Sequence, residues 1–218
     1  LNNKYGIVEA DFLSSELEIV PAFKARSLGF DRSMVAGYGQ DDRVCSYTAI
    51  RALLDTSVPE KTAVCILSDK EEIGSIGATG MASNLFENMI AEIVARTNET
   101  YSELSLRRCL QNSLMLSSDV NAAYDPLNAG LYDKENASIL GGGVTFQKYT
   151  GSRGKSGASD ANPEFIAKVR VAMTKANVSY QMAELGKVDQ GGGGTIAYHA
   201  AKYGMNVLDA GVAVLSMH

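Results

Sequence analysis

Cys65-Ile-Leu-Ser-Asp-Lys-Glu-Glu-Ile-Gly-Ser-Ile-Gly-Ala-Thr-Gly80 is the stretch around which the chain is organised, because an apolar run ends there in acids and then glycines. Residues 62–68 are apolar and rich in β-branched side chains, which predicts a short buried strand, and residues 81–96 have the apolar spacing of a helix. The acids between them follow a strand, where open α/β sheets bind ligands. Neighbouring carboxylates repel each other unless a cation offsets their charge, so the stretch predicts a divalent metal site.

Glu71 and Glu72 are adjacent, and adjacent side chains of an extended backbone point in opposite directions. The two are therefore expected to divide the work, one as a metal ligand and the other as the general base that a hydrolytic metal site requires. A Glu-Glu pair in a loop is by itself more often a solvated surface feature. The other segments of the chain must decide between these two interpretations.

The same stretch resembles the Asp-Asn-Glu-Glu-Val-Gly-Ser type segment of the aminopeptidase I and aspartyl aminopeptidase family. Members of that family are dinuclear zinc exopeptidases. The resemblance implies that Glu71 is the catalytic base and that Glu72 is a metal ligand.

Composition limits the class of protein. The 218 residues are 45% hydrophobic and 21% charged, which suits one sizeable globular domain. A net charge of −5 without Lys/Arg runs gives no electrostatic footprint for nucleic acid or an anionic membrane. No apolar stretch approaches the roughly 18 residues of a membrane span, and the first residues are too charged for a signal peptide. The three cysteines show no C-x-x-C spacing, so reduced thiols and a cytoplasmic location are predicted.

A second pair of acids lies upstream, between a predicted strand at 34–39 and a predicted helix from Val44 to Leu54. Asp41 and Asp42 at a helix start are commonly an N-cap and a first-turn acid favoured by the helix dipole. The resemblance assigns Asp41 as the carboxylate that bridges two metal ions. Asp42 and its neighbour Arg43 would then support the ligands through hydrogen bonds.

A third acid, Asp119, follows a predicted strand at 114–118, after a predicted helix at 103–111. Strand ends at one edge of a sheet converge in space, so Asp119 is expected near Glu71 and Glu72. The resemblance makes Asp119 the terminal carboxylate ligand of one metal. The residues after it lack the histidines of the animal aspartyl aminopeptidases, which argues against a strict preference for acidic N-terminal residues.

Two glycine-rich segments are not nucleotide-binding loops. The basic loop 151–157 follows a predicted strand at 141–150, but a Walker motif would need glycine where Tyr149 stands. The glycines at 74–80 lack G-x-G-x-x-G spacing and follow acids that would repel a pyrophosphate. Exposed basic residues are commonly only solvated. The alternative is that Lys148, Arg153 and Lys155 contact a substrate carboxylate.

Towards the C-terminus, a helix is predicted at 163–176 and a strand at 180–184. The four glycines at 191–194 indicate close backbone approach, either by a ligand or by another loop. His199 follows them in a predicted helix between alanines, where a packed structural histidine is the ordinary outcome.

His218 closes a glycine bend and strand that begin at Val207. The resemblance makes His218 the last metal ligand of the set. The first histidine of the family lies in a His-x-Asp segment ahead of its lid insert, and no histidine precedes His199 here. Because the chain begins at Leu1 rather than Met, we expect that segment upstream in a longer protein. The alternative is a lost second metal and a catalytically degenerate structural subunit.

The complete prediction is a three-layer α/β domain with a mixed central sheet flanked by helices. Residues 1–36 resemble the tail of the lid and dimerisation insert, and 37–218 the catalytic domain, incomplete at both ends. The resemblance implies a metalloaminopeptidase with two divalent ions. Zinc is the expected metal, and the same ligands are compatible with cobalt or manganese. It also implies peptide substrates and a homo-oligomer, up to a dodecamer. A related amide metallohydrolase would use the same residues and remains an alternative.

Overall fold

The computed structural model describes residues 1–98, 100–153 and 155–218, which divide into two compact units, Leu1–Tyr38 and Gly39–His218. The first unit holds two short helices, α1 (Asn2–Tyr5) and α2 (Glu9–Phe12), and an antiparallel pair of strands, β1 (Arg26–Leu28) and β2 (Met34–Ala36). None of its residues is fully buried. The strand ends at Ala36, earlier than predicted, and the assignment of 1–36 to a lid insert stays a prediction.

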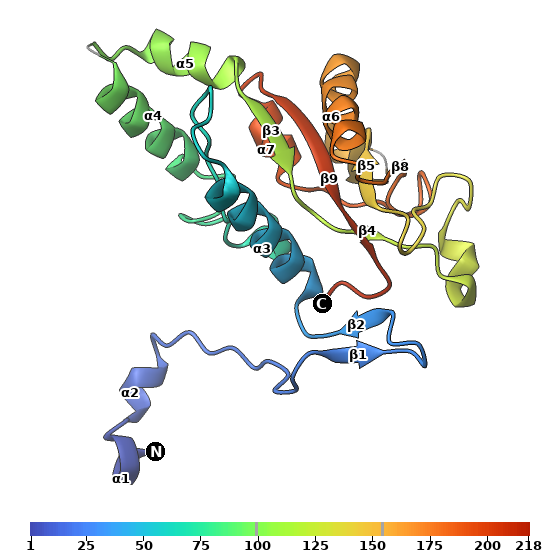
Figure 1. The fold of residues 1–218 in the computed structure, drawn as a ribbon. Helices are drawn as coiled ribbons and strands as arrows, with labels where there is room; N and C mark the ends of the chain where they lie inside the picture. The colour runs from blue at the N-terminus through green and yellow to red at the C-terminus, as the bar shows by residue number, and fades with distance from the viewer. Residues whose placement is uncertain (99, 154) are drawn as a thin grey trace. The chain divides into compact units, whose positions relative to one another are not determined.

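The second unit contains the remaining elements of the described chain, shown in Figure 1. Its helices are α3 (Gln40–Asp55), η1 (Glu71–Ile73), α4 (Leu85–Thr97), α5 (Glu103–Gln111), η2 (Pro126–Leu131), α6 (Pro163–Lys175) and α7 (Ala197–Ala201). Its strands are β3 (Leu114–Ser117), β4 (Asn121–Ala122), β5 (Val144–Gln147), β6 (Tyr149–Ser152), β7 (Ser156–Asp160), β8 (Tyr180–Met182) and β9 (Asn206–Val214).

The main sheet is mixed and is built on β9, its longest strand. The strand order is β3-β9-β5-β8, and β4 also pairs with β9. Strands β3 and β4 run parallel to β9, whereas β5 runs antiparallel to it and parallel to β8. The register places Ser117, Asp209 and Gln147 in one row across three strands. Because paired residues share a face, these three side chains lie on the same side of the sheet.

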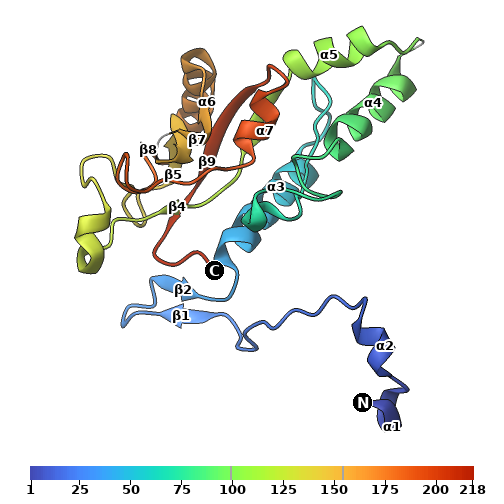
Figure 2. The same cartoon turned by 180° about the vertical axis from the view of Figure 1, so that it is seen from behind.

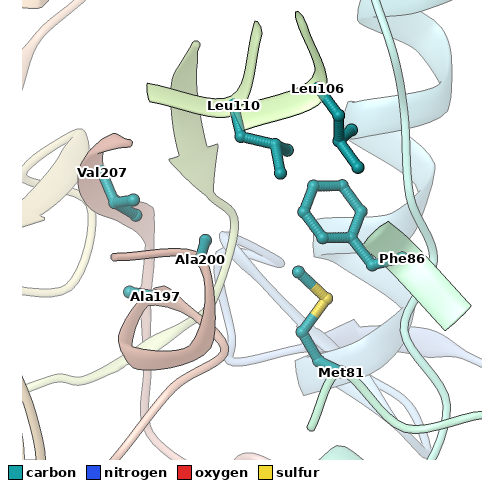
Figure 3. Packing of buried hydrophobic residues seen from close by; sticks show 7 residues of the cluster. All are labelled: Met81, Phe86, Leu106, Leu110, Ala197, Ala200 and Val207. Carbon is teal, nitrogen blue, oxygen red and sulfur yellow. The ribbon is translucent and has the colours of Figure 1, made fainter. Parts of the chain in front are cut away.

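Helices cover both faces of this sheet, as Figures 1 and 2 show for α6 and α7. Leu208 of β9 packs against Phe146 of β5 and, on α6, Phe165. The next residue back, Val207, points the other way and packs with α7, α4 and α5. Figure 3 shows this second cluster, which consists of Met81, Phe86, Leu106, Leu110, Ala197, Ala200 and Val207. The predicted three-layer arrangement is confirmed.

Local sequence accounts for the ends of these helices. The Asn162 side chain accepts hydrogen bonds from the N–H groups of Glu164 and Phe165, and Pro163 takes the first helical position of α6. At α5, the Ser102 hydroxyl accepts from the Ser105 N–H. Both helices therefore begin directly after a residue whose side chain caps the first turn. In α6, proline also fits the first position because the N–H of that position has no partner within the helix.

Two predicted strands are wrong. Residues 62–68 form no strand in the described structure, and Val64 is 49% exposed. Residues 17–20, whose sequence Leu-Glu-Ile-Val also predicts a short strand, are irregular, with Ile19 fully exposed. A strand needs a partner as well as an apolar pattern, and no described segment pairs with either run. The predicted loop at 151–157 is also shorter than expected, because β6 and β7 enter it from both sides.

Candidate metal centre

Asp41 lies in the first turn of α3, after Gly39, whose left-handed conformation (φ 68°) turns the chain into the helix. Its backbone N–H donates to the carbonyl of Met217 at 2.9 Å. This hydrogen bond joins the start of α3 to the segment that follows β9. Asp41 and His218, which are 177 positions apart in the sequence, thereby become neighbours.

Three predicted ligands converge at this point. The His218 Nε2 atom lies 3.4 Å from a carboxylate oxygen of Glu72 and 3.8 Å from one of Asp41. One ligand atom from each of the three residues falls within 4.8 Å of the other two. Two carboxylate oxygens and an imidazole nitrogen are a donor set that suits zinc and other divalent ions. Asp41 is the least exposed of the three.

Asp119, the fourth predicted ligand, follows β3 and reaches the cluster through Asp41. Its carboxyl group lies close enough to the Asp41 carboxyl for the two to interact. Burial, together with the charges of Asp209 and Asp41, raises the pKa of Asp119 to about 9. Carboxylates packed this closely repel each other when ionised, and a bound cation would offset that repulsion. The residues present therefore fit a metal ion.

Glu71 and Glu72 occupy the 3₁₀ helix η1 rather than an extended segment, so the sequence argument about their backbone was wrong. Their side chains still diverge, because a 3₁₀ helix has about three residues per turn and successive side chains point roughly a third of a turn apart. Glu72 faces His218, whereas the charge of Glu71 acts on the buried acids Asp119 and Asp209. The two residues thus present carboxylates to different neighbours.

Residues 69–80 form a closed loop that holds η1 in place. The Thr79 hydroxyl donates to the Asp69 carboxylate at 2.6 Å, and Asp69 pairs with Gly80 as an isolated bridge. A side chain at Gly80 would collide with the Ser75 carbonyl, which explains why glycine stands there. The glycines that follow the acids therefore serve loop closure and not phosphate binding.

A cavity of about 530 Å³ opens beside this cluster. Its polar end is lined by Asp41, Glu71, Glu72 and Asp119, and its remaining wall by apolar residues of α3, α4, β3 and the segment 62–68. This volume is in the range of small-molecule and peptide sites. The predicted acids thus share one solvent-accessible space.

Comparison with known proteins gives the same assignment. The model of the aminopeptidase I zinc metalloprotease (M18) family matches residues 1–218. The chain belongs to this family. It is 61% identical over 218 residues to a probable M18 family aminopeptidase 1 of Clostridium acetobutylicum, covering 100% of this chain and 47% of that protein. The M18 chain spans about half the length of the curated relatives it matches.

Solved structures agree with the fold of the M18 chain. The M18-family aminopeptidase of Thermotoga maritima superposes with a TM-score of 0.94 at 48% identity, covering 100% of this chain and 48% of that one. Aminopeptidase I of Clostridium acetobutylicum gives a TM-score of 0.87 at 59% identity, with 97% and 45% covered. The resemblance recognised in the sequence is therefore confirmed at the level of family and fold.

The three basic residues proposed for substrate binding lie on or beside the β6–β7 hairpin of the M18 chain. The Lys148 ammonium is paired with the Asp160 carboxylate and lies 4.5 Å from the centre of the Tyr149 ring. Arg153 and Lys155 are exposed on the turn between the strands. Their contact with a substrate carboxylate stays a prediction, but the charge of Lys148 already has a partner.

His199 lies on α7, outside the group of three potential ligands. Burial, and then the charge of Lys202, lower the pKa of its imidazole, and its ring packs edge-on against Tyr198 at 5.2 Å. These contacts suit the structural role predicted for it. Of the two residues expected to support Asp41, Arg43 donates its backbone N–H to Gly39, and the Asp42 side chain lies outside the described part of the chain.

Asp209 is the acid that sequence reasoning missed. It lies in the middle of β9 and is 2% exposed. The Thr195 hydroxyl and the Ala210 N–H lie near enough to lower the pKa of Asp209. Neither group has the geometry of a hydrogen bond, so within the described chain both carboxylate oxygens lack a hydrogen-bond partner. Burial dominates and raises the pKa of Asp209 to about 7, with Glu71 and Asp41 adding to the effect. The signal was an acid inside the apolar run Val207–Val214.

Proposed function

We propose that the protein is a metal-dependent aminopeptidase that hydrolyses the N-terminal peptide bond of peptides. The observation that carries the proposal is the convergence of Asp41, Glu72 and His218 within 4.8 Å, with Asp41 and Glu72 lining a cavity. Membership in a zinc metallopeptidase family supports it. Relatives that extend beyond the matched half bear the aminopeptidase name.

Each residue has a proposed role. Asp41 would bridge two divalent ions, Glu72 and His218 would be further ligands of one ion, and Asp119 would be the terminal carboxylate ligand of the other. Support for the bridging role comes from the position of Asp41, which touches both His218 and Asp119. Two zinc ions held there would supply Lewis acidity that makes a bound water acidic near neutral pH.

Glu71 is the proposed general base. Glu71 lines the cavity beside the proposed ligands. Because Glu72 is the residue that faces His218, the Glu71 carboxylate is the one proposed to act on the water. In the reaction, the Glu71 carboxylate removes a proton from the attacking water and then delivers it to the nitrogen of the leaving amine. The carboxylate returns to its ionised form, so no other proton donor is needed.

A dinuclear site normally has nitrogen ligands on both ions, and His218 is the one imidazole in the cluster that the structure describes. We propose that the second comes from residues beyond these 218, as the greater length of the relatives allows. A cytoplasmic location and a homo-oligomer belong to the same proposal. The yeast relative mApe1, which is 25% identical, has been solved as a dodecamer.

The proposal is tested with the full-length protein and a panel of short peptides, by measuring the release of N-terminal residues with and without a chelator. We expect turnover that the chelator abolishes and zinc restores, and about two metal ions per chain. No turnover with one ion or none would support the degenerate structural subunit instead. Release of acyl groups from small amides, with peptides left intact, would point to a related amide hydrolase.

A further inference from the structure

A second cavity, of about 510 Å³, lies between the β6–β7 hairpin and the segment from Glu184 to Gly193. The four-glycine run forms one of its walls by direct packing on β6. The Gly151 N–H donates to the Gly193 carbonyl at 2.8 Å, and a side chain at Gly192 would collide with the Gly151 carbonyl. The close approach predicted for these glycines is therefore to strand β6, rather than to another loop, and it shapes this cavity.

The cavity adjoins the metal centre through the main sheet. Gln147 lines the cavity, is 3% exposed and is the register partner of Asp209. Asp209 in turn lies close enough to Glu71 and Asp41 for their charges to act on it. One strand therefore separates the wall of the cavity from the acids of the proposed catalytic site.

The charged residues that line the cavity differ in whether their charge is paired. Glu184 and Asp160 both line it, and the Lys148 ammonium is committed to Asp160. Lys187 also lines the cavity, but it is exposed to solvent, where its charge is screened. Glu184 is half-buried and has no ion pair within the described chain. Of the two carboxylates that line the cavity, Glu184 is therefore the one without an ion pair in the described structure.

The surroundings of Glu184 favour a cation beside its carboxylate. Burial raises the pKa of its carboxyl group, and the Tyr149 N–H and the more distant Lys148 reverse the effect only in part. A half-buried carboxylate of this kind is stabilised by an opposite charge within about 4–6 Å. A lysine or arginine side chain has the length to bury its methylene stem and present its charge.

We propose that this cavity receives the side chain of the substrate's N-terminal residue and that Glu184 makes a cationic side chain, lysine or arginine, the preferred one. The inference rests on the proposed aminopeptidase function. It assigns Glu184 as a specificity-determining residue and not as part of the reaction itself. It also runs against a role for Lys148 in binding acidic substrates, because Asp160 already holds that ammonium.

The test measures kcat/KM of the full-length protein for lysyl, leucyl and glutamyl amide substrates, in wild type and in Glu184→Gln. We expect the order lysyl, leucyl, glutamyl in wild type, and a fall of at least about tenfold in the lysyl-to-leucyl ratio in the variant. Glu184→Lys should raise the glutamyl-to-lysyl ratio. Glu164→Gln, an exposed change in the first turn of α6, is the matched control and should leave all ratios unchanged.

The outcomes separate this inference from the function on which it rests. A wild-type preference for glutamyl substrates, or a lysyl-to-leucyl ratio that Glu184→Gln leaves unchanged, overturns the role of Glu184 while the aminopeptidase activity stands. Absence of turnover with every substrate overturns both. Melting temperatures of the variants within a few degrees of wild type would show that a changed ratio does not reflect misfolding.

Discussion

At the scale of the residue, the dominant feature is a group of acids placed closer together than their charges favour. Asp119 interacts with the Asp41 carboxyl, and Asp209 on the central strand is close enough for its charge to act on Asp119. Desolvation is the largest cause of the raised pKa of Asp119 and of Asp209. Such an arrangement costs stability in the metal-free protein and suits a site that binds cations.

Asp209 leads to a prediction about pH. Its folded-state pKa of about 7 exceeds the ordinary value of 3.8, so between these pH values the folded protein keeps a proton that the unfolded chain has released. The stability that this proton confers is present at low pH and is lost as the pH rises through 7. Each tenfold difference in proton affinity corresponds to about 1.4 kcal/mol, so Asp209 accounts for at most about 4 kcal/mol.

The measurement is thermal unfolding of the chelator-treated protein at pH 5 and pH 8, in wild type and in Asp209→Asn. Wild type should melt at a lower temperature at pH 8, and the variant should show a smaller decrease. Part of the decrease should persist in the variant, because the raised pKa of Asp119 acts in the same direction. Identical decreases in both proteins would show that Asp209 does not carry the raised pKa.

At the scale of the element, the apolar pattern predicted helices and central strands well but could not predict pairing. Helix α6 appears where expected, because its buried face lies within this chain. Strand β9 was predicted as a glycine bend followed by a strand ending at His218, but it is one continuous strand from Asn206 to Val214 and ends before that histidine. Residues 62–68 have an equally apolar pattern, yet no described strand pairs with them. An apolar run identifies a segment that can be buried, whereas a strand also needs a neighbour to accept its hydrogen bonds.

The candidate site was predictable to a similar extent. The acids at strand and helix ends indicated a metal site, and the family resemblance supplied the roles that spacing alone left open. The structure brings Asp41, Glu72 and His218 together, but the pairing of Asp119 with Asp41 could not be read from the sequence. Asp209 was not predicted, because an acid in an apolar strand is buried only if that strand lies at the centre of the sheet, and the sequence does not give the strand order.

Helix α6 offers a matched test of the packing described here. Val169 is 9% exposed and belongs to the core with Phe146 and Leu208, whereas Val171 on the same helix is 54% exposed. Val169→Ala should lower the free energy of unfolding by roughly 2 kcal/mol, through lost burial and the cavity left behind. Val171→Ala should change it by less than roughly 0.5 kcal/mol, because alanine favours the helix and little burial is lost.

Chemical denaturation of the two variants measures this difference. Equal losses of stability in both would contradict the placement of α6 on the sheet, because they would require Val171 to be as buried as Val169. The identical substitution on one helix removes differences of side-chain chemistry from the comparison.

At the scale of the whole molecule, the matched relatives are about twice as long as this chain, so the activity, the complete site and the assembly of the whole protein stay proposals. Among the described residues, no helix is both long and apolar enough to cross a membrane. The proposed two-metal site, the second imidazole and the homo-oligomer are therefore properties to be measured on the full-length protein.

The division of work between Glu71 and Glu72 is the central claim, and the metal content and turnover of Glu71→Gln and Glu72→Gln in the full-length protein test it most directly. Glu71→Gln should keep the metal content of wild type while kcat falls by about 10²–10⁴-fold, the contribution of a general base. Glu72→Gln should lose metal, because it removes a ligand that faces His218. Near wild-type turnover in Glu71→Gln, or loss of metal there with retention in Glu72→Gln, would contradict the account.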